Sequence, residues 1–373
     1  MYLQGQTVSF TDTTFTNNQA QGFGGAIRAN GGKVKFNVSL GKTNVVSGNT
    51  TVADSYTDKR YDGDQGGFLY LQDGAEANFD VDGTLVIGQA GSKADGISAV
   101  SKDGEVNTIN VSGDGEMIVN SDMTAFVGNL NVNGGSLTLN TGIGEYDMAM
   151  QEAVNKADKT TKDFTYESVA TTITIDGEGS LTTGDLAVNN KLDIDVKSGT
   201  LKTGAISVVK SAEYKDLVVG TEGAFASQTT TGAATLTANG TAEIGSITIN
   251  AEGAKFAADG TGSMTVLGDI AVEAGAFTSS TAKASAANVS SKVAGGFKVE
   301  GGEFVAGKVA AGKAGAVDVA AGSKLTATGD ITGEKGGVTV AGTLVTDLAN
   351  GRELRRRDGQ GCCVDECGCC IQH

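Results

Sequence analysis

Proline is absent from all 373 residues of the chain, and tryptophan is absent as well. Average protein sequences contain about 5% proline, so its absence here extends through every strand and every loop. Proline has no backbone N–H to donate to a β-ladder, and a chain made almost wholly of paired strands therefore excludes it. The same absence excludes collagen, whose triple helix needs proline-rich Gly-X-Y repeats.

Cysteine and histidine are confined to the C-terminal end. The five cysteines lie between residues 362 and 370, and the single histidine is His373. The preceding 361 residues therefore hold no disulfide framework. They also lack the histidine base that Ser–His–Asp or Cys–His catalysis requires. A cysteine-free body suits export through an oxidising periplasm and is equally compatible with the cytosol.

Positive charge is scarce. The formal net charge is −16, and outside the C-terminal tail arginine occurs only as Arg28 and Arg60. Nucleic acids and anionic lipid surfaces require basic patches, so we expect neither as a partner. No apolar stretch is long enough to span a bilayer, and no charged-then-apolar segment follows Met1. If the protein is exported, we expect its signal peptide to lie outside this sequence.

A short unit repeats from about residue 130 onward: two alternating apolar residues, a glycine turn and one more apolar position. Examples are LNVNGGSL at 130–137 and FKVEGGEF at 297–304. The turn glycines are Gly135, Gly179, Gly199, Gly223, Gly253, Gly275, Gly302, Gly322 and Gly342. Glycine suits such corners because it adopts a positive φ without a Cβ clash. Several intervals between these glycines are close to 20 residues, which fits one coil of a β-helix.

We therefore predict an all-β fold, a right-handed parallel β-helix with about 20 residues per coil. Leu192, Ile194 and Val196 alternate with Asp193 and Asp195, which is the pattern of a half-buried strand. A β-sandwich or barrel also has short strands with glycine turns, but its strand spacing need not return to one interval. The leucine-rich repeat is excluded because its Leu-x-x-Leu-x-Leu signature is missing.

The predicted β-helical domain covers residues 1–350 and has one interruption. Residues 144–168 include the run YDMAMQEAVNKADK, whose helix formers predict a loop or short helix outside the coils. Residues 351–373 hold four of the six arginines and every cysteine. The spacing CCxxxCxCC matches no standard zinc pattern. We therefore favour a disordered or artefactual tail over a thiolate metal cluster.

The N-terminal segment carries a pair of motifs, FTNN at 15–18 and GGAI at 24–27. They resemble the FxxN and GGA[I/L/V] elements of polymorphic outer-membrane proteins and related autotransporter passengers. The run at 68–88 resembles the coils of pertactin-like adhesins, so the resemblance covers about the first 90 residues. The matching residues are Phe15, Asn18, Gly24, Gly25, Ala26 and Ile27. Paired glycines suit a tight corner, Ile27 suits the core, and stacked asparagines can hydrogen-bond between coils.

The resemblance implies a type V secretion protein with a signal peptide, a β-helical passenger on the outer-membrane surface and a C-terminal β-barrel translocator. We expect the translocator, like the signal peptide, to lie outside this sequence. Such passengers often act in adhesion, so we expect an extracellular adhesin with a role in virulence. Its Thr-, Ser- and Asn-rich faces would bind a host surface protein or a glycan, or associate with an identical chain.

A catalytic function is the main alternative. A polysaccharide lyase or glycoside hydrolase built on a β-helix would need clustered carboxylates, or Arg and Lys bases, on one face. Residues 61–351 contain no arginine, and the acidic residues there alternate with Thr, Asn and Ala. We therefore expect no catalytic residue, no cofactor and no metal site. The enzyme and an S-layer or matrix protein remain the alternatives to an adhesin.

Overall fold

The structure is a computed structural model that describes most of the chain, with several gaps. The described residues are 1–52, 66–89, 92, 94–100, 104–121, 123, 126–143, 169–210, 231–346 and, for the backbone only, 353–355. Within these ranges every regular element is a strand and none is a helix, which confirms the predicted all-β class. The insertion predicted at 144–168, the turn glycine Gly223 and the cysteine-containing tail lie outside the described residues.

The chain divides into two compact units. Unit 1 comprises Met1–Asp193 with Ser211–Thr230, and unit 2 comprises Ile194–Lys210 with Thr231–His373. The division falls within strand β21 (Lys191–Val196).

Unit 1 is built from short strands. They are β1 (Tyr2–Gln4), β2 (Thr7–Thr11), β3 (Phe15–Thr16), β4 (Gln19–Gln21), β5 (Ile27–Asn30), β6 (Lys33–Val38), β7 (Thr43–Ser47), β8 (Thr50–Val52), β9 (Leu69–Gln72), β10 (Glu76–Val81), β11 (Thr84–Ile87), β12 (Ile97–Val100), β13 (Thr108–Ser112), β14 (Glu116–Val119), β15 (Phe126–Val127), β16 (Asn129–Val132), β17 (Ser136–Leu139), β18 (Thr171–Ile175), β19 (Ser180–Thr183) and β20 (Leu186–Val188).

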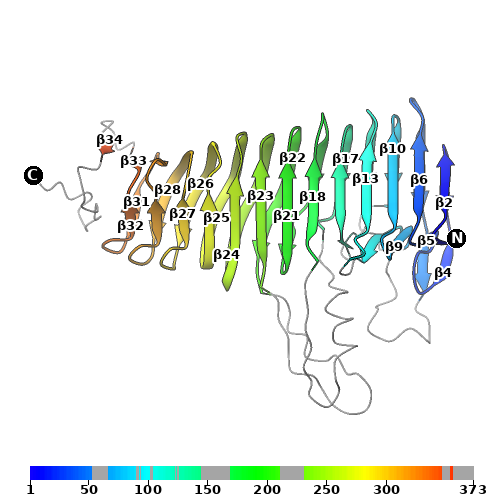
Figure 1. Ribbon diagram of the computed structural model, residues 1–373, viewed down its shortest axis with the longest axis horizontal. Helices are drawn as coiled ribbons and strands as arrows, with labels where there is room; N and C mark the ends of the chain where they lie inside the picture. Colours follow the sequence, from blue (N-terminus) through cyan, green and yellow to red (C-terminus); the bar gives the residue numbers. More distant parts are fainter. Residues whose placement is uncertain are drawn as a thin grey trace, which may run out of the picture. The chain divides into compact units, whose positions relative to one another are not determined.

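Parallel pairing organises most of these strands into three ladders, and β4 and β8 form a separate parallel pair. Ladder 1 is β2–β6–β10–β13–β16–β18, ladder 2 is β3–β7–β11–β14–β17–β19, and ladder 3 is β1–β5–β9–β12–β15. Figure 1 shows β6, β10 and β13 of ladder 1 side by side. Parallel strands need a long crossover, and here the chain passes through the other two ladders before it returns. From β1 to β17 the ladders are visited in the order 3, 1, 2.

The core of unit 1 consists of apolar residues stacked in register. One column of ladder 1 is Val8, Val34, Ala77, Ile109, Leu130 and Ile173. In the next inward column Phe36 lies between Phe10 and Phe79, with ring centroids 5.7 Å and 4.6 Å apart. Complete burial of such a side chain contributes about 1.5–3 kcal/mol. Residues of like chemistry therefore lie above one another at each step of the ladder.

Unit 2 contains both long and short strands, and all but one of them pair in parallel. They are β22 (Thr200–Val208), β23 (Ala233–Ala238), β24 (Thr241–Asp259), β25 (Ser263–Ser279), β26 (Lys283–Ser291), β27 (Phe297–Val299), β28 (Glu303–Ala311), β29 (Val317–Val319), β30 (Lys324–Ala327), β31 (Ile331–Gly333), β32 (Val338–Val340), β33 (Thr343–Thr346) and β34 (Glu353–Arg355).

The registers of unit 2 repeat at the interval that the sequence predicted. The backbone N–H of Lys308 donates to Oδ1 of Asn288, 20 residues earlier, and Nζ of Lys324 donates to Oε1 of Glu303, 21 residues earlier. Residues of one inward column, all buried, are Leu201, Ala242, Met264, Ala284, Phe304, Leu325 and Leu344. The short period thus returns the chain to the same column.

The predicted turn glycines occupy two kinds of place. Six of them have a positive φ: Gly135, Gly199, Gly253, Gly275, Gly302 and Gly322. Gly179 and Gly342 do not, but an added Cβ would collide there with backbone oxygens of Val132 and Ala320. The structure differs from the predicted turns at Gly253 and Gly275, which lie inside the continuous strands β24 and β25. Register shifts between Ile249 and Lys255 let the β24–β25 pair turn the corner without ending.

The C-terminal part of unit 2 contains one exception to parallel pairing. The backbone of β34 pairs antiparallel with β33. Three residues of the predicted unstructured tail therefore form a strand, since backbone pairing with an edge depends little on side-chain composition.

Candidate functional site

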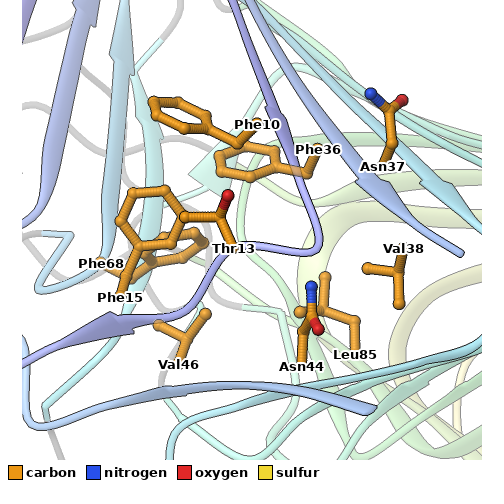
Figure 2. Close-up of a pocket in the computed structure, with 10 residues that line it drawn as sticks. All are labelled: Phe10, Thr13, Phe15, Phe36, Asn37, Val38, Asn44, Val46, Phe68 and Leu85. Atoms are coloured by element: carbon orange, nitrogen blue, oxygen red, sulfur yellow. The ribbon is translucent and has the colours of Figure 1, made fainter. Parts of the chain in front are cut away.

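The first family motif packs into the core of unit 1. Phe15 lies on β3, with its ring centroid 4.9 Å from that of Phe10 and 5.4 Å from that of Phe68. Figure 2 shows these rings with Phe36 around a small cavity. The cavity volume is about 10 Å³, which is the space of a single water molecule. Phe15 is therefore a packing residue, and this cavity is too small for an organic ligand.

The second family motif forms a close backbone contact. Gly24 has φ 66°, and a Cβ on Gly25 would overlap the carbonyl oxygens of Thr50 and Gly67. The amide of Gly25 donates to the carbonyl of Gly66 at 3.1 Å. GGFL at 66–69 thus lies beside GGAI, as the pairing of β5 with β9 requires.

Ala26 and Ile27 complete this motif in the core. Both side chains are buried. Ile27 stacks in register on Leu69, which in turn stacks on Ile97. The four residues of the GGAI element therefore act together as a tight corner followed by a core strand.

A polar column, exposed at Asn18 and buried at Asn49 and Asp95, supports the same corner. The side-chain amide of Asn18 donates to Oδ1 of Asn49 at 2.6 Å, and the amide of Asn49 donates to Oδ1 of Asp95 at 2.6 Å. The backbone N–H groups of Asn49 and Gly48 also donate to the Asp95 carboxyl group, both at 2.8 Å. Asn49 is 0% and Asp95 1% exposed. Every donor here points at a partner within the protein, so the column is a structural element.

Sequence reasoning anticipated stacked asparagines but did not identify Asp95. The sequence signal is the DGI triplet at 95–97, which the register aligns with GFL at 67–69. Asp95 adopts a positive φ of 66°, a conformation that aspartate tolerates better than most residues. The triplet is thus a degenerate copy of the glycine motif.

A second asparagine column lies on the outer side of ladder 1. Asn131 donates to Oδ1 of Asn110 at 2.8 Å, and Asn110 donates to Oδ1 of Asn78 at 2.9 Å. These side chains are partly buried by their neighbours. Because each side-chain amide both donates and accepts a hydrogen bond, the column continues from one strand to the next. Since the side chains are only partly buried, they also present amide groups at the surface.

An aromatic group lies on the outer side of ladder 3. Tyr2, Arg28 and Tyr70 are in register on β1, β5 and β9. The guanidinium carbon of Arg28 lies 5.5 Å from the ring centroid of Tyr2, 5.3 Å from that of Phe23 and 5.8 Å from that of Tyr70. Cation–π attraction therefore fixes the rings around the guanidinium. Tyr2 is exposed, Phe23 is half-buried and Tyr70 is buried.

An amide column runs beside this aromatic column. Gln4, Asn30 and Gln72 are in register, each two residues after a member of the first column. The amide of Asn30 donates to the Tyr2 hydroxyl at 3.3 Å, and Arg28 Nη2 donates to Oε1 of Gln72 at 3.0 Å. Sequence reasoning missed this group because its members are spread over 70 residues. The available signal was the outward-alternating IRAN and LYLQ at 27–30 and 69–72.

Charge is distributed unevenly around these columns. Residues 1–52 contain Arg28, Lys33, Lys35 and Lys42 against the single acid Asp12. Lys33 pairs with Glu76 at 2.7 Å, and this hydrogen bond lowers the pKa of Glu76. The backbone N–H of Ser39 donates to Asp12 at 2.8 Å and lowers the pKa of that carboxyl group. Both acids therefore favour the charged form.

The described residues contain no group of three or more His, Cys, Asp or Glu placed to hold a metal ion. In that same part of the chain, no helix has the length and apolar character needed to cross a membrane. Comparison with protein-family models, with curated proteins and with solved structures found no match.

Proposed function

We propose that each unit is a right-handed parallel β-helix and that the chain is the passenger-type part of an adhesin on a bacterial outer surface. Parallel pairing, the constant order in which unit 1 visits its ladders and the 20- to 21-residue separations in unit 2 support the β-helix. The right hand follows from the strong chirality of parallel crossovers.

The observation that carries the binding function is the alignment of small polar side chains into outward columns. In unit 2 one such column is Ser207, Thr248, Ala271, Ser290, Ala310 and Thr332. Four of these six residues carry a hydroxyl group and two are alanines, so the column presents hydroxyl groups over an extended face. Many weak contacts made at once give high avidity without a deep pocket, as a surface adhesin requires.

The bacterial surface assignment rests on the resemblance of FTNN and GGAI to autotransporter passengers. Two features of the structure are consistent with it. The motif glycines lie at a tight corner, and the motif asparagine Asn18, just before β4, bonds to Asn49, just before the paired strand β8. Both are roles that a repeated coil needs, so the motif is used here as a coil-building element.

Surface display tests this function. The chain would be fused to a heterologous outer-membrane translocator in a bacterium that neither clumps nor adheres, and sedimentation and attachment to cultured host cells would be measured. We expect clumping, attachment or both. A matched control displays the Gly25→Val variant, whose added side chain would overlap two backbone oxygens. Equal behaviour of the displayed chain and the empty translocator would contradict the proposal.

The purified chain incubated with a panel of polysaccharides addresses the enzyme alternative. An adhesin leaves their molecular mass unchanged. Reproducible release of reducing ends or of unsaturated products would replace the adhesin by a hydrolase or lyase.

A further inference from the structure

The outer side of ladder 3 combines two kinds of side chain in adjacent columns. Tyr2, Arg28 and Tyr70 form the aromatic column, and Gln4, Asn30 and Gln72 form the amide column. Residues two apart on a strand are separated by about 7 Å on the same face. The exposed ring of Tyr2 and the row of amide groups therefore lie within the width of one small ring-shaped ligand.

The aromatic rings are held in place from within. Tyr70 is 2% exposed and supports the group from the inside, with its ring centroid 4.6 Å from that of Phe23. Tyr2 is 55% exposed, and its hydroxyl accepts the hydrogen bond from Asn30. The guanidinium of Arg28 contacts all three rings. A ligand would thus meet a ring whose position is already fixed, which reduces the entropy lost on binding.

Side chains, and not the backbone, must do the recognition at this face. β5 pairs with β1 on one edge and with β9 on the other. Its N–H and C=O groups are therefore engaged in the ladder, so an added peptide strand has no edge of β5 to pair with. A ligand recognised here has to use an apolar ring face and amide hydrogen bonds.

We propose that this face binds a neutral sugar ring of a surface glycan. The C–H face of a pyranose is apolar and matches an aromatic face, while its hydroxyl groups both donate and accept, as amide side chains do. Arg28 acts as a positioning residue, because its Nη2 bonds to Gln72 and its Nε is buried. This inference rests on the proposed adhesin function and names the ligand class that one face of it would take.

The full chain carrying a fluorescent label tests the proposal on an array of immobilised oligosaccharides. The array would hold neutral hexose and N-acetylhexosamine chains beside sialylated and uronic acid chains. We expect retention on neutral chains that persists at high salt, because stacking and amide hydrogen bonds carry no net charge. Tyr2→Ala and Asn30→Ala should each weaken binding about tenfold or more.

Asn37→Ala is the matched control for Asn30→Ala. Asn37 lies on the neighbouring strand β6, where its amide donates to Ser9 and Thr11 on the outer side of ladder 1. We expect this variant to bind as the unaltered chain does. Far-ultraviolet circular dichroism of each variant shows whether the strands are intact, and Tyr2→Phe should retain binding because it keeps the ring face.

Three results would overturn the proposal: no retention on any oligosaccharide, retention that Tyr2→Ala and Asn30→Ala leave unchanged, or retention on acidic chains alone that salt abolishes. The surface-display assay distinguishes a failure of the glycan site from a failure of the adhesin function. Clumping or attachment that persists with Tyr2→Ala and Asn30→Ala would retain the adhesin and remove the glycan site. Glycan binding by purified protein without attachment of displaying cells would retain the site and remove the adhesin.

Discussion

Asp95 accepts three hydrogen bonds in the core of unit 1, from the backbone amides of Gly48 and Asn49 and from the Asn49 side chain. Replacement by alanine would remove this acceptor from the two buried donors of Asn49 and from the partly buried amide of Gly48. Each unsatisfied buried donor costs about 1–3 kcal/mol. We therefore expect Asp95→Ala to lower the free energy of unfolding by about 3 kcal/mol or more, measured by urea denaturation of the full chain.

Asp95→Asn and Asp95→Gly separate the hydrogen bonds from the backbone conformation. Asparagine keeps one acceptor oxygen for Asn49 and tolerates the positive φ of this position. Glycine adopts the positive φ without strain but removes both carboxyl oxygens that accept the hydrogen bonds. The expected order of stability is wild type, Asp95→Asn, then Asp95→Gly, and a glycine variant as stable as wild type would contradict the role of the carboxyl group.

Gly25 is expected to be far less replaceable than Gly74. A Cβ at Gly25 would overlap two backbone oxygens, whereas a Cβ at Gly74 would meet nothing within 4 Å. Gly74 has φ +72°, so Gly74→Ala should cost only the left-handed strain of about 1–2 kcal/mol. Gly25→Ala should cost more, because backbone must shift on two neighbouring strands. Denaturant midpoints of the two variants provide the measurement, and equal midpoints would refute the close contact.

At the scale of an element, the Asn78–Asn110–Asn131 column links three strands of ladder 1. Asn110→Ala removes both of these bonds, each worth about 1 kcal/mol, and also the 3.3 Å bond from the Asn110 amide to Oε1 of Glu76. Asn131→Ala removes only one of them and is the matched control. We expect Asn110→Ala to be the more destabilising in thermal unfolding, since its loss interrupts the column in the middle.

The Lys33–Glu76 pair joins β6 to β10 and is expected to make stability depend on pH. The folded pKa of Glu76 is lowered, chiefly by its hydrogen bond from Lys33. The pair therefore contributes its stability above the unfolded glutamate pKa of about 4.3, and loses it as the pH falls through the lowered value. With Glu76 27% and Lys33 53% exposed in their side chains, we expect a contribution of about 0.5 kcal/mol.

Lys33→Met tests this pair. Denaturant midpoints of the variant and the wild type should differ at pH 7 and converge in acid, where Glu76 is protonated in both proteins. A difference that stays constant down to acid pH would assign the effect to packing of the lysine stem.

At the scale of the whole molecule, the proposed β-helix should respond locally to damage. In a solenoid each repeat contacts mainly its neighbours. We expect Gly25→Ala to accelerate hydrogen exchange in peptides that contain β4, β5, β8 and β9, and to leave exchange in unit 2 unchanged. Mass spectrometry of peptic fragments measures both. Uniform acceleration through the two units would indicate one cooperative core in place of a stacked β-helix.

The sequence by itself determined the local features of the protein. Alternation such as Leu192, Ile194 and Val196 specifies a half-buried strand from a few neighbouring residues. The missing proline and the interval near 20 residues indicated parallel strands, and the all-β class with extensive parallel pairing is confirmed. Local periodicity suffices for these features because each depends on a short stretch of chain.

Only the tertiary structure decided which distant residues meet. Arg28 and Gln72 are 44 residues apart, and Asn49 and Asp95 are 46 apart, separations well beyond the predicted interval. Register in a parallel ladder is set by pairing between whole strands, and a shift of one residue would turn every side chain to the other face. The aromatic column and the buried Asp95 therefore follow from long-range register, which a 20-residue period does not contain.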